Sequence, residues 1–133
     1  MKYFKPSSDF WVCKVNFVDE NNLLVGFDYS SLCCENFGWY INKSSDELFL
    51  DDNHTSKHIN DFLEGWVFDP QYFKETDNKD DVDSFGTVKN QAVFRLVKGD
   101  EELFLHLFNV HNGYYSHGFE MSDDGATIHA GML

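Results

Sequence analysis

The sequence predicts an α+β fold that is mostly β, with an antiparallel sheet and one short helix packed on it. The first observation is the stretch from Gln91 to Met121, where three apolar-rich runs are separated by two short turn-forming breaks. The second is the aromatic share of 17%, with 14 Phe, because aromatic side chains favour the pleated, half-buried surface of a sheet. The third is that a single segment, Asn53 to Gly65, has good helical spacing of its apolar residues.

The stretch from Gln91 to Met121 predicts a C-terminal three-stranded antiparallel meander. Gly99, in the first break, can adopt the positive φ angle that a tight turn requires. Asn112-Gly113, in the second break, is the pair that most readily forms a type I′ hairpin turn. The middle run, Glu102 to Val110, is mainly apolar on both faces, so we expect a strand that is covered on both sides.

The N-terminal part predicts a β-hairpin. Asp9 to Asp19 alternates imperfectly between apolar and polar residues, and Leu23 to Tyr29 forms the returning strand after the turn at Glu20-Asn21-Asn22. Gly26 inside the second strand indicates a bulge or a close backbone approach. After Met121 the chain has little periodicity, so Ala126 to His129 is either an edge strand or part of a frayed tail.

The helix is expected between Asn53 and Gly65. Asn53 or Thr55 can cap its first turn, and Gly65 stands at the position after its last turn, where glycine is favoured. Three apolar residues recur at i, i+3 and i+4 on one face: Ile59, Phe62 and Leu63. This face would pack on the sheet.

Length and charge limit the classes of protein that this chain can be. A chain of 133 residues fits one domain, 1–133. Lys and Arg number 10 against 23 Asp and Glu, a net charge of −13, which repels nucleic acids and anionic membrane surfaces and attracts a basic protein partner. No run approaches membrane-spanning length and the N-terminus lacks the apolar core of a signal peptide, so we expect a cytoplasmic protein.

The cysteines agree with a reducing compartment. Cys13, Cys33 and Cys34 are odd in number, and adjacent cysteines rarely bridge each other. We therefore expect reduced thiols rather than a disulfide framework.

The residues predicted to contact a partner are acidic and aromatic. The segment from Thr76 to Ser84 is the strongest charge run and has almost nothing apolar to bury, so it is expected to be a surface loop. Aromatic side chains near it and at the end of the meander supply large contact area at low entropic cost. The predicted contact residues are Asp77, Asp80, Asp81, Asp83, Tyr72, Phe73, Tyr114 and Tyr115.

No catalytic residue and no cofactor are predicted. The chain has no phosphate-binding glycine loop and no zinc-peptidase motif; Thr55 follows His54 where that motif needs a glutamate. His54 and His58, at i and i+4 of the helix, are a weak metal-site candidate. These histidines and the Cys33-Cys34 loop leave a metal-dependent or small-molecule enzyme open as a third interpretation.

Two short motifs support a resemblance. Cys33-Cys34-Glu35 follows the first hairpin, and Asn112-Gly113-Tyr114-Tyr115-Ser116 closes the middle strand of the meander, with the short helix between them. In this order the chain resembles a family of small uncharacterised domains of phages and bacteria that show a Cys-Cys-Glu loop and a closing Asn-Gly-Tyr-Tyr-Ser turn. The resemblance spans Asn16 to Met121 and supports the fold, and it implies no activity.

The leading functional hypothesis is an acidic, non-enzymatic immunity protein that neutralises a basic, nuclease-type bacterial toxin. Nuclease toxins need basic surfaces to hold phosphates, so an acidic inhibitor gains association rate and complementarity. The alternative is a phage-type acidic decoy that occupies a host nucleic-acid-binding protein.

Overall fold

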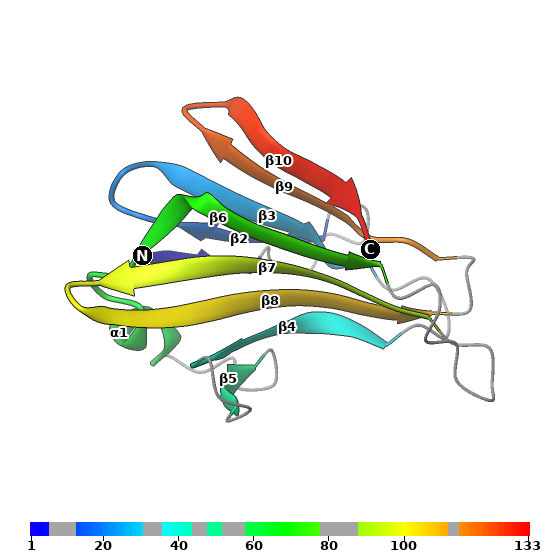
Figure 1. Cartoon of the computed structure of the whole chain (residues 1–133), viewed down its shortest axis with the longest axis horizontal. Coiled ribbons are helices and arrows are strands. Elements are labelled where there is room, and N and C mark those ends of the chain that lie inside the picture. The colour runs from blue at the N-terminus through cyan, green and yellow to red at the C-terminus, as the bar shows by residue number, and fades with distance from the viewer. Residues whose placement is uncertain (6–12, 31–35, 44–47, 52–57, 78–87, 112–114) are drawn as a thin grey trace.

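The computed structural model describes residues 1–5, 13–30, 36–43, 48–51, 58–77, 88–111 and 115–133, with the backbone alone for 48–51, 77 and 88. Its strands form two antiparallel sheets that lie face to face as a sandwich (Figure 1). The predicted class, mostly β with antiparallel sheets and one short helix, is confirmed.

Sheet A has the strand order β1-β2-β3-β9-β10. Its strands are β1 (Lys2–Phe4), β2 (Lys14–Val18), β3 (Leu23–Asp28), β9 (Gly118–Asp123) and β10 (Ala126–Met132). Sheet B has the order β5-β4-β8-β7-β6. Its strands are β5 (Leu48–Asp51), β4 (Asn36–Asn42), β8 (Glu101–His111), β7 (Val88–Lys98) and β6 (Val67–Asp77).

The predicted N-terminal hairpin is confirmed. β2 and β3 pair in register from Lys14 opposite Asp28 to Val18 opposite Leu24, around the predicted turn. Gly26 marks a close approach, because a Cβ atom there would stand 3.0 Å from Oδ1 of Asn16. The alternative of an edge strand after Met121 is also the correct one, since Ala126–Met132 forms β10.

The predicted meander is wrong in its third strand. β7 and β8 do pair around Gly99, whose φ is 60°, but β9 pairs with β3 and β10 in the other sheet, and β6 takes the third position beside β7. The reason is the buried face of β8, which needs a second layer to cover it. Phe119 and Met121 of β9 belong to that layer and are 3% and 0% exposed. The predicted turn at Asn112-Gly113 lies outside the described residues.

The helix is shorter in the structure than in the prediction. α1 spans Ile59–Phe62, and the predicted capping positions Asn53 and Thr55 lie outside the described residues. Gly65 has a φ of 76°, as expected of a residue that follows a helix end. Ile59 and Leu63 are buried, whereas Phe62 is 39% exposed.

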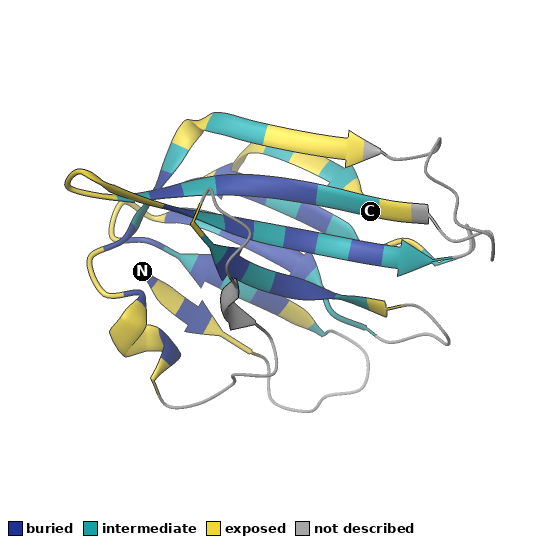
Figure 2. Ribbon diagram, turned by 60° about the horizontal axis from the view of Figure 1, so that its bottom comes forward, coloured by how far each residue is buried: buried dark blue, intermediate teal, exposed yellow. Residues whose placement is uncertain are grey.

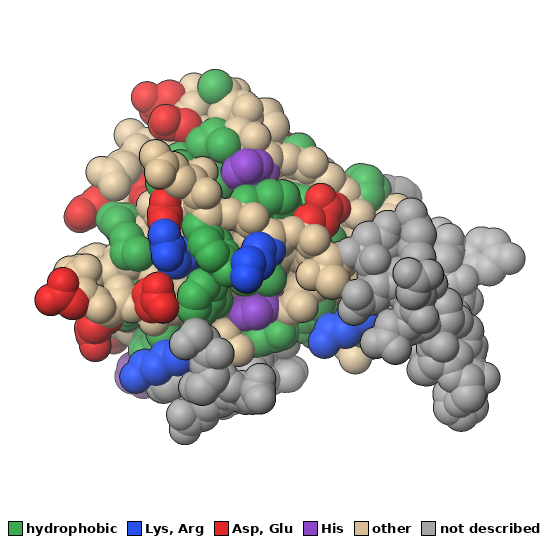
Figure 3. Space-filling view, in the orientation of Figure 1, with side chains coloured by type: hydrophobic (Ala, Val, Ile, Leu, Met, Phe, Trp, Pro, Cys, Tyr) green, Lys and Arg blue, Asp and Glu red, His purple; other side chains and the backbone are tan. Residues whose placement is uncertain are grey.

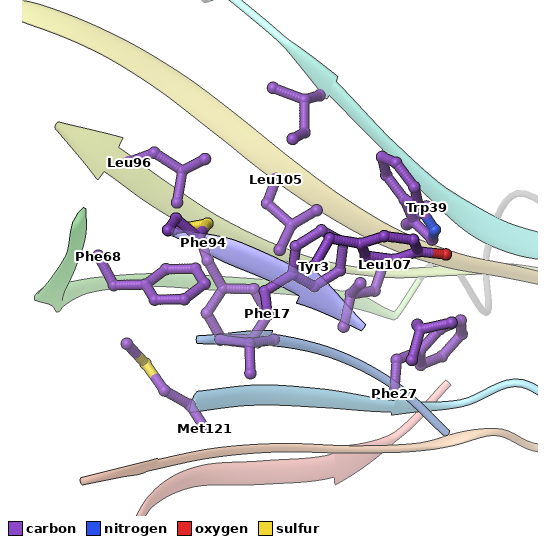
Figure 4. Close-up of a cluster of buried hydrophobic side chains, with 14 of the residues drawn as sticks. Tyr3, Phe17, Phe27, Trp39, Phe68, Phe94, Leu96, Leu105, Leu107 and Met121 are labelled. Atoms are coloured by element: carbon purple, nitrogen blue, oxygen red, sulfur yellow. The ribbon is translucent and has the colours of Figure 1, made fainter. Parts of the chain in front are cut away.

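The core lies between the two sheets, and the buried positions alternate with exposed ones along the strands (Figure 2). Aromatic rings from both sheets meet there: the Phe17 ring lies 5.2 Å from that of Trp39, edge to face, and the Tyr3 ring also lies 5.2 Å from Trp39 (Figure 4). The largest fully buried side chains are those of Trp39, Phe17, Phe27, Phe94, Ile41, Leu63, Leu96, Leu105, Leu107, Met121, Leu133 and His117.

One buried carboxylate joins the two sheets. Asp19, 5% exposed, ends the first strand of the hairpin. Its Oδ1 accepts hydrogen bonds from the backbone N–H groups of Asn21 at 2.9 Å and Leu23 at 3.0 Å. Its Oδ2 accepts from the N–H of Phe68 in β6 at 2.9 Å. The Asp19 side chain therefore fixes the β2–β3 turn of sheet A against the start of β6 in sheet B.

We expect Asp19→Ala to lower the free energy of unfolding by about 3 kcal/mol, because buried N–H groups that lose their acceptor each cost about 1–3 kcal/mol. Urea unfolding followed by tryptophan fluorescence measures the change. Glu20→Ala is the matched control, since Glu20 is the exposed neighbouring carboxylate and such changes usually stay within about 0.5 kcal/mol. Equal effects of the two substitutions would contradict the role given to Asp19.

Candidate functional site

Three hairpin turns and the helix gather at one end of the sandwich (Figure 1). The β2–β3 turn and the β9–β10 turn are adjacent, because Leu23 pairs with Asp123. Lys98, just before the β7–β8 turn, donates from Nζ to the backbone oxygen of Glu64 at 2.8 Å, which places that turn beside the end of α1. Strand pairing and this hydrogen bond therefore bring the three turns and the helix together.

These turns and α1 carry a group of exposed carboxylates that we call the acidic end. Its members are Glu20, Asp61, Glu64, Asp100, Glu101, Glu102, Asp123 and Asp124, and all eight are exposed. Figure 3 shows acidic side chains along this end of the molecule. Carboxylates gathered in this way give the end a negative potential, which attracts cationic groups.

A groove of about 560 Å³ runs between β1, the β2–β3 turn and α1. Glu20, Asp61 and Glu64 are among its lining residues, together with the apolar ring of Phe4, which is 51% exposed. Lys2 also lines it. The groove thus offers carboxylates around an accessible phenylalanine.

A second depression, of about 410 Å³, lies on the other flank of the helix. Phe62 and Trp66 line it together with Glu101 and Glu102, and Lys43 also lines it. Phe62 is 39% exposed, whereas Trp66 is 7% exposed. Each flank of α1 therefore combines an exposed phenylalanine with carboxylates, the arrangement needed to contact a partner that is both basic and apolar.

The described start of the acidic run predicted for partner contact, at Asp77, is at the other end of the sandwich. Asp77 is the last residue of β6 and pairs with Asn90, at the end of sheet B away from Gly99. The side chain of Asp77 and the whole of Asp80, Asp81 and Asp83 lie outside the described residues. Their predicted role stays a prediction, and the structure brings together a different set of carboxylates.

The two predicted aromatic anchors of β6 point in opposite directions. Tyr72 lies on the outer face of sheet B, with its ring 5.5 Å from that of Phe104 and with Arg95 Cζ at 5.0 Å from the ring centre. The predicted contact role of Phe73 stays a prediction. Phe73 is half-buried between the sheets, stacked on His129 at 4.3 Å, because strand residues alternate between the two faces.

The remaining predicted residues give no common site. Tyr115 is half-buried and its backbone oxygen accepts a hydrogen bond from Asn109 at 2.8 Å, while Tyr114 lies outside the described residues. His58 has an 84% exposed side chain 3.8 Å from Asp61, and its predicted metal partner His54 is also outside the described residues. Within the described part of the chain, no group of three His, Cys, Asp or Glu side chains could hold a metal ion.

Sequence reasoning missed a polar network on the outer face of sheet B. The Tyr40 and His106 rings stack at 4.4 Å with an interplanar angle of 9°. Nε2 of Gln91 donates to Tyr40 Oη at 2.7 Å and lies 2.6 Å from Nδ1 of His106. Nε2 of His106 lies 2.9 Å from Oδ1 of Asn42. These contacts fit a neutral imidazole that carries its proton on Nε2, because Gln91 donates and Asn42 accepts.

Burial sets the protonation of this network. Desolvation lowers the pKa of His106 to about 4, with a smaller contribution from the charge of Lys89. Burial also raises the pKa of Tyr40, against the opposing hydrogen bond from Gln91. Both rings are therefore neutral at pH 7 and form part of a shallow depression of about 420 Å³ that Lys43, Lys74 and Phe104 also line.

No protein-family model, curated protein or solved structure matches this chain. The resemblance to small phage and bacterial domains therefore stays an expectation; Cys33-Cys34-Glu35 and Asn112-Gly113-Tyr114 lie outside the described residues. Among the helical residues that the structure describes, none belongs to a helix with the length and apolarity needed to cross a membrane.

The lowered pKa of His106 predicts a pH-dependent stability. Because the folded state holds the imidazole neutral down to about pH 4 and the unfolded chain protonates it below about pH 6.5, the unfolded state binds more protons in this window. The stability that the neutral His106 network contributes to the folded state is fully present above about pH 6.5 and is lost as the pH falls toward about 4. Urea unfolding at several pH values should show that the free energy of unfolding falls more steeply with decreasing pH in the wild type than in His106→Phe. The difference in slope should correspond to the uptake of up to about one additional proton on unfolding.

His58→Phe is the matched control for this measurement, because the His58 side chain is 84% exposed. Its pH dependence should follow that of the wild type. If His106→Phe leaves the slope between about pH 4 and pH 6.5 unchanged, the neutral network is disproved.

Proposed function

We propose that this chain is a non-enzymatic acidic binding protein that engages a basic protein partner through its acidic end. The observation that carries the proposal is the gathering of eight exposed carboxylates on three turns and α1, around two exposed phenylalanines. The specific form that we favour is an immunity protein that neutralises a basic, nuclease-type toxin in the cytoplasm. The net charge of −13 supports it.

Electrostatics would contribute in two ways. A negative end raises the rate of encounter with a cationic surface, and this effect weakens as salt screens the charges over about 8–10 Å. In the contact itself, carboxylates would occupy the lysine and arginine side chains that a nuclease uses to hold phosphates. An inhibitor of this kind needs no chemistry of its own.

The exposed phenylalanines would supply the apolar part of the contact. Phe4 and Phe62 stand in or beside the two depressions that flank α1. Binding energy in protein interfaces concentrates in a few apolar and aromatic anchors, surrounded by polar groups that exclude water. The carboxylates at the borders of the two depressions would form that surrounding ring.

Affinity capture at low salt from the organism that produces the chain is the first test. We expect the wild type to recover a basic protein, and the variant Asp61→Lys/Glu64→Lys to recover it at least about tenfold less well, because rim charges control association. The recovered protein, once purified, should lose its nucleic-acid-cleaving activity when mixed with the wild type in equal amounts.

Glu75→Lys/Glu120→Lys is the matched control, since it makes the same change in net charge away from the acidic end. It should capture the partner as the wild type does. Recovery of no basic protein, even at low salt, would contradict the proposal. A captured host nucleic-acid-binding protein without toxicity would instead favour the acidic decoy.

A further inference from the structure

Among the described strands, β1, β10, β5 and β6 stand at the edges of the two sheets, and two of these have visible protection. The N–H of Tyr3 in β1 donates to the Asn60 side chain of α1 at 2.7 Å, so the helix covers that edge. β6 contains Pro70 and Lys74 and a register shift between Phe68 and Phe73. Proline, lysine and bulges are the usual devices that prevent an edge strand from pairing with another chain. β5, with four residues, is short.

β10 has few of these devices. Its seven residues, Ala126–Met132, include no Asp, Glu, Lys or Arg and no proline. Its two large apolar residues, Ile128 and Met132, are 38% and 59% exposed. A bulge between Thr127 and His129 leaves Ile128 without a partner on β9, while the pairing from His129 to Met132 is regular.

The hydrogen-bonding pattern shows which backbone groups of β10 face outward. His117 and Leu133 exchange both of their N–H···O bonds, each at 2.9 Å, so they form a hydrogen-bonded pair. In an antiparallel ladder such pairs alternate with pairs that do not exchange bonds. The register continues through Met132 opposite Gly118 and Ala130 opposite Glu120. The N–H and C=O groups of Ala130 and Met132 therefore point away from β9, toward the side on which no described strand pairs with β10.

We propose that β10 is a self-association edge, which pairs in antiparallel fashion with β10 of a second copy about a two-fold axis at Ala130. Ala130 would then lie opposite its own counterpart, with their outward N–H and C=O groups exchanging hydrogen bonds. Met132 lies two residues after Ala130 and Ile128 two residues before it, so each exposed Met132 would face the Ile128 of the other copy. The two copies of sheet A would form one continuous sheet.

The apolar side chains of β10 favour a second copy over a basic partner at this edge, because the two-fold pair would bring the exposed Met132 of each copy against the exposed Ile128 of the other. The paired segment itself carries no carboxylate, and the acidic end is nearest to it at Asp123, which pairs with Ala126, four residues or about 13 Å from Ala130. Two carboxylates lie beside it: Glu120 of β9 pairs with Ala130 and accepts a hydrogen bond from Thr127 Oγ1 at 2.6 Å, and Oε1 of Glu75 in β6 lies 3.2 Å from the position of a Cβ at Gly131. Because each copy has a net charge of −13, their association should strengthen as salt is added.

Sedimentation equilibrium of the full chain, from micromolar to about 1 mM, at about 50 and about 500 mM NaCl, tests the proposal. We expect a monomer–dimer equilibrium whose dimer fraction rises with protein and with salt. Ala130→Pro removes an outward N–H group without removing a bond to β9, and Ala130→Lys places two like charges at the axis; both should remain monomeric. Hydrogen exchange should show the amides of Ala130 and Met132 becoming protected as concentration rises.

Ala126→Lys is the matched control, because it makes the same substitution on the same strand, four residues from the axis. It should dimerise as the wild type does. Circular dichroism and thermal unfolding establish that each variant is folded. The proposal is overturned by a chain that stays monomeric throughout, by a dimer that weakens with salt, or by a dimer that folded Ala130→Pro and Ala130→Lys both retain. None of these results bears on capture of a basic protein by the acidic end.

Discussion

The whole structure depends on one constraint: an apolar sheet face must be covered by another apolar face. Leu103, Leu105 and Leu107 of β8 form such a face in sheet B, and Phe17, Phe27 and Met121 form the opposing one in sheet A. A helix of four residues is too short to cover either of these faces alone, so each sheet needs the other to cover it. The chain therefore divides its strands between two layers, and this division decides where every turn, edge and outer face lies.

The distribution of charge follows from that division. Strand residues that face inward must be apolar, so the carboxylates of the chain are concentrated where the strands end. The two layers bring the β2–β3, β7–β8 and β9–β10 turns to the same end, where Asp61 of α1 and Glu64 just after it add two more carboxylates. Asp19 illustrates the exception, since a carboxylate can be buried when three backbone N–H groups converge on it. The acidic end is thus a consequence of topology as well as composition.

Sequence reasoning succeeded where local patterns decide the structure. The β2–β3 hairpin, the Gly99 turn and the glycine after α1 are each determined by short-range chemistry, and all three are as predicted. The third strand of the meander was assigned to the wrong sheet because pairing partners depend on which apolar face covers which, and that is a property of the whole chain. The same reason explains why the acidic end was missed: a carboxylate stands at each turn, but only the strand order places those turns together.

The acidic end and the β10 edge are compatible because of their orientation. β10 begins at the β9–β10 turn, which belongs to the acidic end, and runs away from it. In an antiparallel pair the second β10 runs in the opposite direction, so the two acidic ends would lie at opposite extremes of the dimer. That arrangement minimises repulsion between two chains of the same sign and leaves each acidic end accessible. A dimer would therefore present two independent surfaces to a basic partner, and the affinity at each end should not depend on self-association.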